Sequence, residues 1–591
     1  PGCSYIIPRM TYSLSAALCV LAIAGFSWLT GQAAQAKLGL QDGESGPDAC
    51  LLSFMVGFGL LICVLFVLAT AQLLRPLPVG AALGLVTVIS LAYVWKSAGG
   101  WRNIFGPTPS RPRPVGMLLV LALFLLLSLR AFAPALEWDE LAYHLPVARD
   151  FARSGGLTVF ENLRYPLNAW NLHLVWSGAL MFGSEAAPHL VNACLAVLVT
   201  LGIYRFGRNV SGNASGIIAA LIFLYFARDL ANTAYVGIAL TAFIFFAFQA
   251  FLSWQQTRRE GYLLLAAFLL AMAAGVKYHG LLYLPVFALA LACMGGGWRS
   301  FFKVGLVLAL FGSWWYLRNA WITGDPLHPF GGGVFGYWAW NADDLAAQHA
   351  DVARYGHHLP LVLAPALAFV LLAGRRRPED MALMLMAYGG LALWYVTSRY
   401  DRYLMATIPF LAILSARVLV AGAQRLSARM WTAGRPRGEN ERWSRSLETT
   451  AFAFVLLVGV AVGFREWEKA CFSEACVERV YARELLSWPA VRSVSGFEDL
   501  MLYQFGLENE FYVLGNNAAG DWFGPYRYAR IKATSGDPVA LRDVLLDLGR
   551  DSILVNRVRA GFEGFPQTEA LAGEFEPLYE DGRVSLYRIA R

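Results

Sequence analysis

The sequence predicts an α-helical polytopic membrane protein that ends in a small α/β domain. Of the 591 residues, 57% are hydrophobic and 15% are charged, whereas a soluble chain of this length would carry more charge. Apolar runs recur up to residue 464, and short strand-like runs follow from residue 465. The formal net charge of +7 requires no nucleic-acid partner, because the arginines fall in short loops between apolar runs.

The apolar runs predict about 14 membrane spans. They cover residues 13–29, 51–73, 79–95, 115–136, 189–204, 214–226, 235–254, 262–275, 281–294, 302–317, 361–372, 381–396, 403–420 and 449–464. Several are shorter than the roughly 20 residues that a straight span needs, so their boundaries are approximate. The first run lacks a basic flank and a cleavage site, and we interpret it as a span rather than a signal peptide.

The distribution of basic residues predicts the orientation of the spans. Arginines and lysines cluster in alternate loops, at 205–208, 258–259, 299–303 and 375–377, and the positive-inside rule places such loops in the cytoplasm. This orientation is consistent for all spans only if residues 166–182 do not cross the membrane. Their Asn171 and His173 favour a helix that lies in the membrane interface. Loops 137–188 and 319–358 are then external, as is the chain after residue 464. The second of these loops is long enough to act as a lid.

Three parts are expected along the chain. Residues 1–114 carry additional N-terminal spans, residues 115–464 form the main membrane domain, and residues 465–591 form an external α/β domain. In this last part, strand-like runs occupy residues 511–514, 553–555 and 584–587, and a helix begins with Asp537 as its N-cap and Pro538 at its first position.

Two cysteines differ from the others because they lie in a polar segment. Cys471 and Cys476 follow the last predicted span, whereas most of the other cysteines lie inside apolar runs and act as small hydrophobic residues there. If the segment is external, a short-loop disulfide is possible, and two free thiols are the alternative.

The candidate functional stretch is residues 137–144, directly after the predicted fourth span. It contains Glu137, Asp139, Glu140 and His144, with Trp138 and Tyr143 between them. A single ionisable residue at a span end is an ordinary anchor, whereas four within eight residues indicate a site. In a helix, Glu140 and His144 would share one face, and Asp139 and Tyr143 would share the neighbouring face.

Basic residues end several other predicted spans on the same side. They are Lys277, Arg318, Arg399 and Arg402. Each one taken alone is explained by snorkelling to the lipid headgroups. Together, around a loop that bears carboxylates, they indicate a site for a phosphate anion at the membrane face.

A set of short motifs resembles the GT-C membrane glycosyltransferases. Trp138-Asp139-Glu140 with Tyr143-His144 resembles the first external loop of that family. Further landmarks are residues 165–168 (YPLN), 275–278 (GVKY), 314–319 (WWYLRN), 323–326 (TGDP) and Arg402-Tyr403. The set, over roughly residues 115–420, is similar to the bacterial branch with the aminoarabinose transferases, rhizobial lipopolysaccharide sugar transferases and protein O-mannosyltransferases.

This resemblance implies a polyprenyl-phosphate-linked sugar as donor and an inverting transfer on the outer face of the bacterial inner membrane. It implies that Asp139 is a general base or a metal-associated group, and that Lys277 and Arg402 meet the donor phosphate. We add Arg318 and Arg399 as further phosphate ligands. Glu140 and His144 are expected to orient Asp139, or Asp139 and Glu140 to bind Mg²⁺ or Mn²⁺. The expected substrate contacts are Glu137, Tyr143, Tyr165, Trp170 and Tyr278.

One position departs from the family pattern. Relatives commonly carry an acidic residue where this chain has Gly237. If the carboxylate of the relatives helps to hold a metal or the acceptor, three alternatives follow. The protein is metal-independent, it uses Asp229 or Glu140 in place of that carboxylate, or it is inactive. The alternatives to a transferase are a non-catalytic membrane subunit and a transporter or flippase of a lipid-linked solute, although transporters place their polar residues mid-span. The sugar and the acceptor, whether a lipid, a polysaccharide or a protein, stay open.

Overall fold

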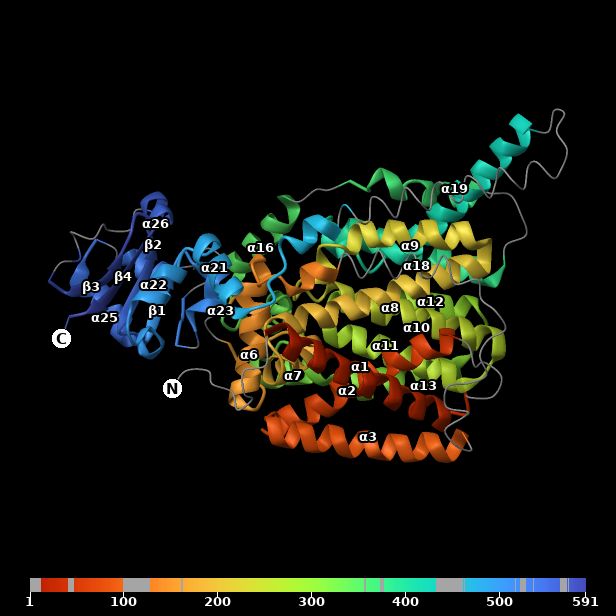
Figure 1. The fold of residues 1–591 in the computed structure, drawn as a ribbon, viewed down its shortest axis with the longest axis horizontal. Coiled ribbons are helices and arrows are strands. Elements are labelled where there is room, and N and C mark those ends of the chain that lie inside the picture. Colours follow the sequence, from red (N-terminus) through yellow and green to blue (C-terminus); the bar gives the residue numbers. More distant parts are fainter. Residues whose placement is uncertain are drawn as a thin grey trace.

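The computed structural model shows a bundle of helices with a small α/β domain at one end (Figure 1). It describes residues 12–40, 47–98, 128–160, 163–354, 358–371, 377–431, 461, 463–515, 517–520, 528–534, 536–563, 571 and 573–590.

Seven helices among these residues are long and apolar enough to cross a membrane. They are α1 (Tyr12–Lys37), α2 (Pro47–Thr70), α3 (Pro76–Ala98), α8 (Ala186–Ser211), α10 (Gly237–Thr257), α18 (Pro378–Thr397) and α19 (Ile408–Trp431). An eighth span consists of α13 (Trp298–Gly312) and α14 (Trp314–Thr323), which meet at a bend of 57°. Shorter apolar helices are α9 (Asn213–Ala227), α11 (Glu260–Val276) and α12 (His279–Cys293). The chain is a multi-pass membrane protein.

Most of the predicted spans coincide with these helices. The run at 302–317, predicted as one span, breaks between α13 and α14. The run at 361–372 is divided into η4 (Leu361–Leu363), α17 (Pro365–Ala368) and η5 (Phe369–Leu371), and Pro365 has no N–H with which to continue a helix across that point. Most of the runs at 115–136 and 449–464 lies outside the described residues.

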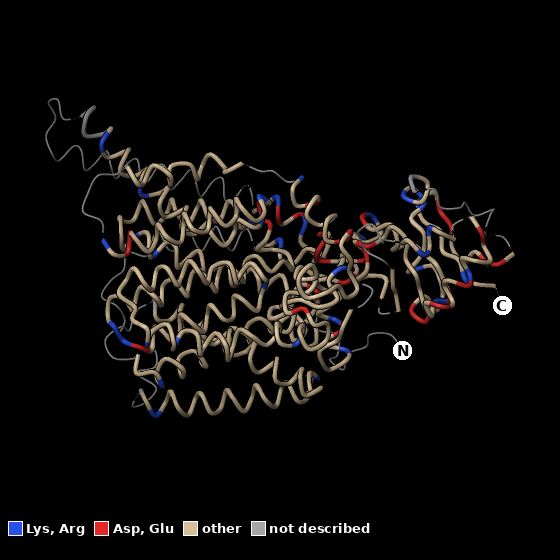
Figure 2. The backbone as a smooth tube through the Cα atoms, turned by 180° about the vertical axis from the view of Figure 1, so that it is seen from behind, with Lys and Arg blue, Asp and Glu red and all other residues tan. Residues whose placement is uncertain are grey.

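The segment predicted not to cross forms α7 (Asn171–Phe182), which has only 12 residues. It lies beside α6 (Leu145–Ser154) at the end of the bundle nearest the α/β domain (Figure 1). Figure 2 shows the charged residues gathered at the two ends of the bundle and around its junction with the α/β domain, while the helices between are almost free of charge. The polar loops therefore form two faces, and the candidate stretch belongs to the face that adjoins the α/β domain.

The C-terminal domain contains a four-stranded sheet in the order β1-β2-β4-β3. Its strands are β1 (Leu502–Phe505), β2 (Ser552–Asn556), β3 (Phe575–Glu580) and β4 (Val584–Ile589). The first two are parallel, and the other pairs are antiparallel. Helix α25 (Pro538–Asp547) packs on one face through Leu541 and Leu545. The side chain of Asp537 caps this helix by accepting from Val539 N and Ala540 N, so the predicted helix start is confirmed.

One predicted strand is wrong. Residues 553–555 and 584–587 are strands, but Phe511–Leu514 forms the short helix α23, and β1 and β3 were not predicted. A four-residue apolar run has no periodicity that separates strand from helix. Here Phe511 packs into the core of the membrane domain rather than into the sheet, and this tertiary contact decides the conformation.

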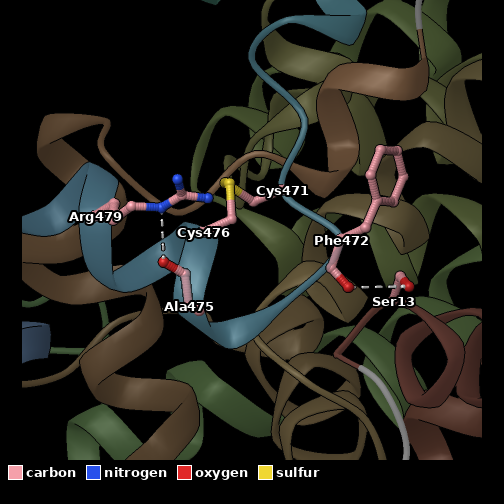
Figure 3. Close-up of a disulfide and its surroundings, with 6 residues drawn as sticks. All are labelled: Ser13, Cys471, Phe472, Ala475, Cys476 and Arg479. Carbon is pink, nitrogen blue, oxygen red and sulfur yellow. Dashed lines mark hydrogen bonds between the residues drawn. A yellow bond between two sulfur atoms is a disulfide. The ribbon is translucent and has the colours of Figure 1, made fainter.

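The first part of the C-terminal region is continuous with the membrane domain. Helix α21 (Glu474–Glu484) contributes Val477 and Tyr481 to the core of the bundle, and the Tyr481 hydroxyl donates to Glu185 Oε2 at 2.5 Å. At the start of α21, Cys471 and Cys476 form a disulfide (Figure 3). Of the two alternatives, a disulfide or two free thiols, the structure has the disulfide.

The segment around this disulfide contacts two parts of the bundle, the end of η1 (Ser128–Phe132) and the start of α1. The N–H of Cys471 donates to the Phe132 carbonyl at 3.0 Å. The Ser13 hydroxyl donates to the Phe472 carbonyl at 3.4 Å (Figure 3). The disulfide thus closes the loop through which the C-terminal region docks on the bundle.

Candidate active site

The candidate stretch is built on a π-helical turn. Residues Glu140–His144 form η2, in which the N–H of Leu145 bonds to the carbonyl of Glu140, five residues back. Such turns are rare and occur frequently at functional sites. Asp139 stands immediately before the turn, and the Tyr143 hydroxyl donates to its Oδ2 atom at 3.1 Å. The predicted pairing of Asp139 with Tyr143 is therefore present.

Arg402 meets the same carboxylate from the far end of the chain. Its Nη1 atom lies 2.7 Å from Asp139 Oδ2. Arg402 belongs to η6 (Asp401–Leu404), just before α19. Three tyrosine rings surround its guanidinium group, with Tyr400 at 4.6 Å, Tyr235 at 5.4 Å and Tyr403 at 5.6 Å from ring centroid to carbon. These contacts hold a cation in a fixed position just before α19.

Lys277 is the second cation of this cluster. It lies between α11 and α12, and its Nζ atom is 3.7 Å from the ring centroid of Tyr403. Burial and then the neighbouring Arg402 lower the pKa of Lys277 to about 7, while Asp139 opposes the shift. Two cations and one carboxylate therefore share a confined space, which leaves an excess of positive charge for an incoming anion.

Glu140 and His144 face away from Asp139, each toward its own partner. Glu140 is buried and accepts from His189 Nε2, from the N–H of Ala234 at 2.6 Å and from the N–H of Glu137 at 3.3 Å. The sequence predicted Glu140 and His144 on one face, as in an α-helix. In the structure Glu140 meets the N–H of Ala234, and the ring of His144 lies 5.8 Å from that of the next residue, Tyr235.

His144 packs among aromatic side chains that adjoin the site. Its Nδ1 atom lies 2.8 Å from His173 Nε2, and its ring is 5.7 Å from that of Trp176. Burial and then His173 keep the pKa of His144 well below its usual range, so its imidazole is neutral at pH 7. His144 therefore buttresses Tyr143, whose ring centroid lies 4.1 Å away.

The long loop after α14 packs against the site. It contains α15 (Gly332–Phe335) and α16 (Ala342–Arg354). Tyr165 links it to the candidate stretch, because its ring lies 5.4 Å from Tyr143 and 6.1 Å from Trp340. Its hydroxyl also donates to Gln348 Oε1 at 3.3 Å. The loop expected to act as a lid thus contacts a residue expected to bind substrate.

The remaining candidate residues lie around this cluster at different depths. Tyr278 donates to the His328 carbonyl at 2.6 Å, and Trp170 is buried with its ring 6.5 Å from that of Tyr143. Arg318 donates to the Thr158 carbonyl at 2.7 Å, and Arg399 lies 5.5 Å from the Tyr395 ring. Neither of these arginines contacts Asp139 in the described part of the chain. Glu137 is half-exposed and lies 3.7 Å from Arg130.

The two carboxylates proposed as metal ligands do not fit that role. Asp139 is occupied by Arg402 and Tyr143, and Glu140 by His189 and two backbone amides. Among the described residues, no group of three or more His, Cys, Asp or Glu side chains converges as a metal site would require. A cation pairs with Asp139 here, and that cation is an arginine.

Gly237, the departure from the family pattern, begins α10 and faces the site. A Cβ atom built at this position would lie 3.7 Å from Leu230 Cδ1 and 4.0 Å from the Arg402 carbonyl oxygen. Both are ordinary contact distances. A Cβ atom at this position would therefore fit without a clash.

Tyr235, Tyr400 and Tyr403 were not predicted as functional residues. The signal was present for two of them, since Tyr400 and Tyr403 flank Arg402 in the sequence. For Tyr235, the only indication in the sequence was its position two residues before Gly237. Without the fold, nothing indicates that its ring faces Arg402.

An apolar groove lies between α12 and α18. Its volume is about 410 Å³. Val396, one of its lining residues, stands three positions before Arg399 in the chain, and α12 begins two positions after Lys277. The groove therefore runs along the two helices whose ends carry the basic residues.

Comparison with known proteins gives a fold and a family. A solved structure of ArnT from Cupriavidus metallidurans bound to undecaprenyl phosphate is similar to this chain, with a TM-score of 0.50 and 13% sequence identity. The similarity covers 80% of this chain and 97% of that one.

Two proteins of Shigella flexneri are similar in sequence. The uncharacterized protein SF2092/S2214 is 29% identical over 141 residues, which are 21% of this chain and 73% of that protein. The uncharacterized protein SF2093/S2215 is 30% identical over 131 residues, which are 22% of this chain and 64% of that protein. A family model described as SF2091/S2213 matches residues 477–588, a range that includes β1, β2, β3 and all but the last residue of β4.

A second family model covers most of the membrane domain. It matches residues 13–361 and thus includes helices α1 to α3, which pack into the core of the bundle. These N-terminal helices were expected as an addition to the membrane domain. The chain has the fold of the GT-C membrane glycosyltransferases and belongs to the family described as "Domain of unknown function (DUF8201)".

Proposed function

We propose that this protein is an integral-membrane glycosyltransferase that moves a sugar from a polyprenyl-phosphate donor to an acceptor outside the cytoplasm, with inversion. The observation that carries the proposal is the cluster of Asp139, Arg402 and Lys277, together with the apolar groove between α12 and α18. Displacement of a lipid phosphate from an anomeric carbon needs a base on the acceptor and positive charge on the leaving group. The cluster supplies both.

In the proposed reaction, Asp139 accepts the proton of the acceptor hydroxyl. The hydroxyl oxygen then forms a bond to the anomeric carbon, the bond from that carbon to the phosphate oxygen breaks, and its electron pair leaves with the polyprenyl phosphate. Asp139 has one oxygen held by Arg402 and Tyr143, which orients the other oxygen as the acceptor of the proton.

Arg402 and Lys277 receive the phosphate. The ion pair of Arg402 with Asp139 represents the state before the donor binds. A donor phosphate offers Arg402 a second anionic partner, so the guanidinium group is then shared between the phosphate and Asp139. Lys277 adds a second positive charge at the same place.

The groove between α12 and α18 suits the polyprenyl chain. Its lining is almost entirely apolar and includes Leu289, Leu393 and Val396, and undecaprenyl phosphate is the ligand named for the similar ArnT structure. Ala392→Trp should fill the groove and raise the KM of long-chain donors more than that of short-chain soluble analogues. An equal effect on both donors would rule out this path for the chain.

The function itself is tested by release of polyprenyl phosphate from a panel of polyprenyl-phosphate sugars. We expect release by the wild type and its loss in Asp139→Asn, with Asp401→Asn as the matched control on an exposed neighbouring carboxylate. Equal release by wild type and Asp139→Asn would assign the base elsewhere. No release from any donor, with lipid binding retained, would instead support a non-catalytic subunit.

A bacterial inner-membrane location, with the C-terminal domain on the outer side, is part of the proposal. The disulfide supports it, because such bonds persist in oxidising compartments. Labelling of an engineered cysteine in the C-terminal domain by a membrane-impermeant reagent in intact cells tests the orientation.

A further inference from the structure

A charged cavity is lined by Arg130, which also lies 3.7 Å from Glu137 of the candidate stretch. Its volume is about 260 Å³, slightly below the roughly 300–1,000 Å³ of sites for drug-sized ligands, so it suits one sugar unit. Three parts of the chain build it. They are η1 (Ser128–Phe132), the connection around η3 (Leu230–Asn232) and the segment that follows the last predicted span.

The cavity carries more positive than negative charge. Four cations and two carboxylates line it: Arg130, Arg228, Arg465, Lys469, Asp229 and Glu466. Arg130 is their centre, because it lies 2.8 Å from Asp229 and 3.8 Å from Glu466. Lys469 lies 3.3 Å from Glu466. Arg465 is exposed and has no ion-pair partner in the described part of the chain. The excess charge favours an anionic ligand.

Asn232 adds a second and independent requirement. Its side chain lines the cavity and is only 4% exposed. The Nδ2 group donates to the Arg228 carbonyl at 2.6 Å, whereas the buried Oδ1 atom has no hydrogen-bond partner among the described residues. A buried acceptor without a donor is costly. A ligand hydroxyl would satisfy it, and an anion would not.

The cavity is connected to the reaction site through Glu137. Arg130 Nη2 lies 3.7 Å from Glu137 Oε1, and Glu137 stands two positions before Asp139. Arg130 therefore links the cavity to the loop that carries the proposed base. The cavity is separate from Lys277 and Arg402, which are assigned to the donor phosphate.

We infer that this cavity binds an acidic sugar of the acceptor, one that carries a phosphate or carboxylate group next to free hydroxyls. The anion binds to Arg465 and Lys469, and a hydroxyl donates to Asn232 Oδ1. The inference rests on the proposed function, since it gives that function its acceptor class. The binding itself needs neither donor nor transfer.

The test measures binding by the full chain in nanodiscs of zwitterionic lipid, without donor. The probes are glucose 6-phosphate, glucuronate, glucose and inorganic phosphate. We expect both acidic sugars to bind more tightly than glucose or phosphate. In the double variant Arg465→Gln/Lys469→Gln, the affinity for the acidic sugars should fall at least roughly tenfold, since charge-assisted hydrogen bonds are lost. Arg483→Gln, an exposed arginine of α21 outside the cavity, should bind like the wild type.

Asn232→Leu tests the hydroxyl contact. It should remove the preference for glucose 6-phosphate over inorganic phosphate while phosphate itself still binds. Phosphate bound as tightly as the sugar phosphate by the wild type would overturn the inference in favour of a simple anion site. Unchanged affinity in the double variant would overturn the site.

Anionic lipid is the remaining competitor. If phosphatidylglycerol in the nanodisc displaces glucose 6-phosphate and its effect disappears in the double variant, the cavity binds a lipid headgroup and the inference fails. Acidic-sugar binding without polyprenyl phosphate release from any donor would leave the cavity in place and contradict the transferase. If the double variant releases polyprenyl phosphate and transfers the sugar as the wild type does, the transferase stands and the assignment of the cavity to the acceptor fails.

Discussion

The Oδ2 atom of Asp139 lies 2.7 Å from the Nη1 atom of Arg402, so the carboxylate of the first external loop pairs with an arginine from just before α19. The Tyr143 hydroxyl binds the same oxygen. Both partners on one oxygen leave the other to face a substrate. This arrangement joins the proposed base to the proposed phosphate ligand, and it makes several outcomes testable.

Tyr143→Phe should reduce kcat roughly ten- to hundredfold, because it removes one hydrogen bond to a charged group. The KM of the donor should change little, since Tyr143 positions Asp139 and does not touch the phosphate. Steady-state kinetics with a polyprenyl-phosphate sugar would measure both. Tyr395→Phe, an exposed tyrosine of α18, is the control. A rise in KM with unchanged kcat would assign Tyr143 to the donor instead.

The donor affinity should depend on pH through Lys277. With a pKa of about 7, Lys277 is charged below pH 7 and loses its charge as the pH rises through 7, whereas an ordinary lysine would stay charged to about pH 10. We expect kcat/KM for the donor to fall from pH 6.5 to 8.5, since this ratio reports the free enzyme.

Lys277→Arg should flatten this profile, because arginine stays charged throughout the range. Lys277→Met should have a low kcat/KM for the donor at every pH. A wild-type profile that is flat to pH 9 would show that another group receives the phosphate.

Glu140 should matter for folding more than for chemistry. Glu140→Ala leaves His189 and the N–H groups of Ala234 and Glu137 without their buried acceptor, at a cost of about 3–5 kcal/mol. Glu140→Gln keeps an acceptor oxygen and should cost less. Thermal unfolding in detergent would rank them, with Asp139→Asn expected close to the wild type. Stable Glu140→Ala protein without activity would instead make Glu140 a catalytic residue.

The disulfide should stabilise the docking of the C-terminal region. Closure of a loop this short is worth about 2 kcal/mol in the chain-entropy model. Cys471→Ser/Cys476→Ser should therefore be cleaved faster by protease near residue 471 than the wild type, whereas Cys293→Ser, which changes an exposed free cysteine, should not. If the double variant is cleaved no faster than the wild type, the contacts of Phe472 and Tyr481 are enough to keep the C-terminal region docked.

Some features followed from local chemistry alone. Apolar runs located most of the helices, because burial in lipid depends on composition along the chain. The contact of Asp139 with Tyr143 and the cap at Asp537 involve residues at most four positions apart. The short motifs around residues 138–144 and 275–278 were enough to indicate the GT-C fold.

Other features required the fold, because they join residues that are distant in the chain. Only tertiary packing decided that Phe511–Leu514 is a helix on the membrane domain, that Glu140 meets His189, and that Arg402 meets Asp139. The cavity around Arg130 likewise collects charges from three separate segments. The sequence by itself determined which segments enter the membrane and which polar residues stand at their ends. Which of these residues meet was decided by helix packing, since a contact across the bundle leaves no periodic signal along the chain.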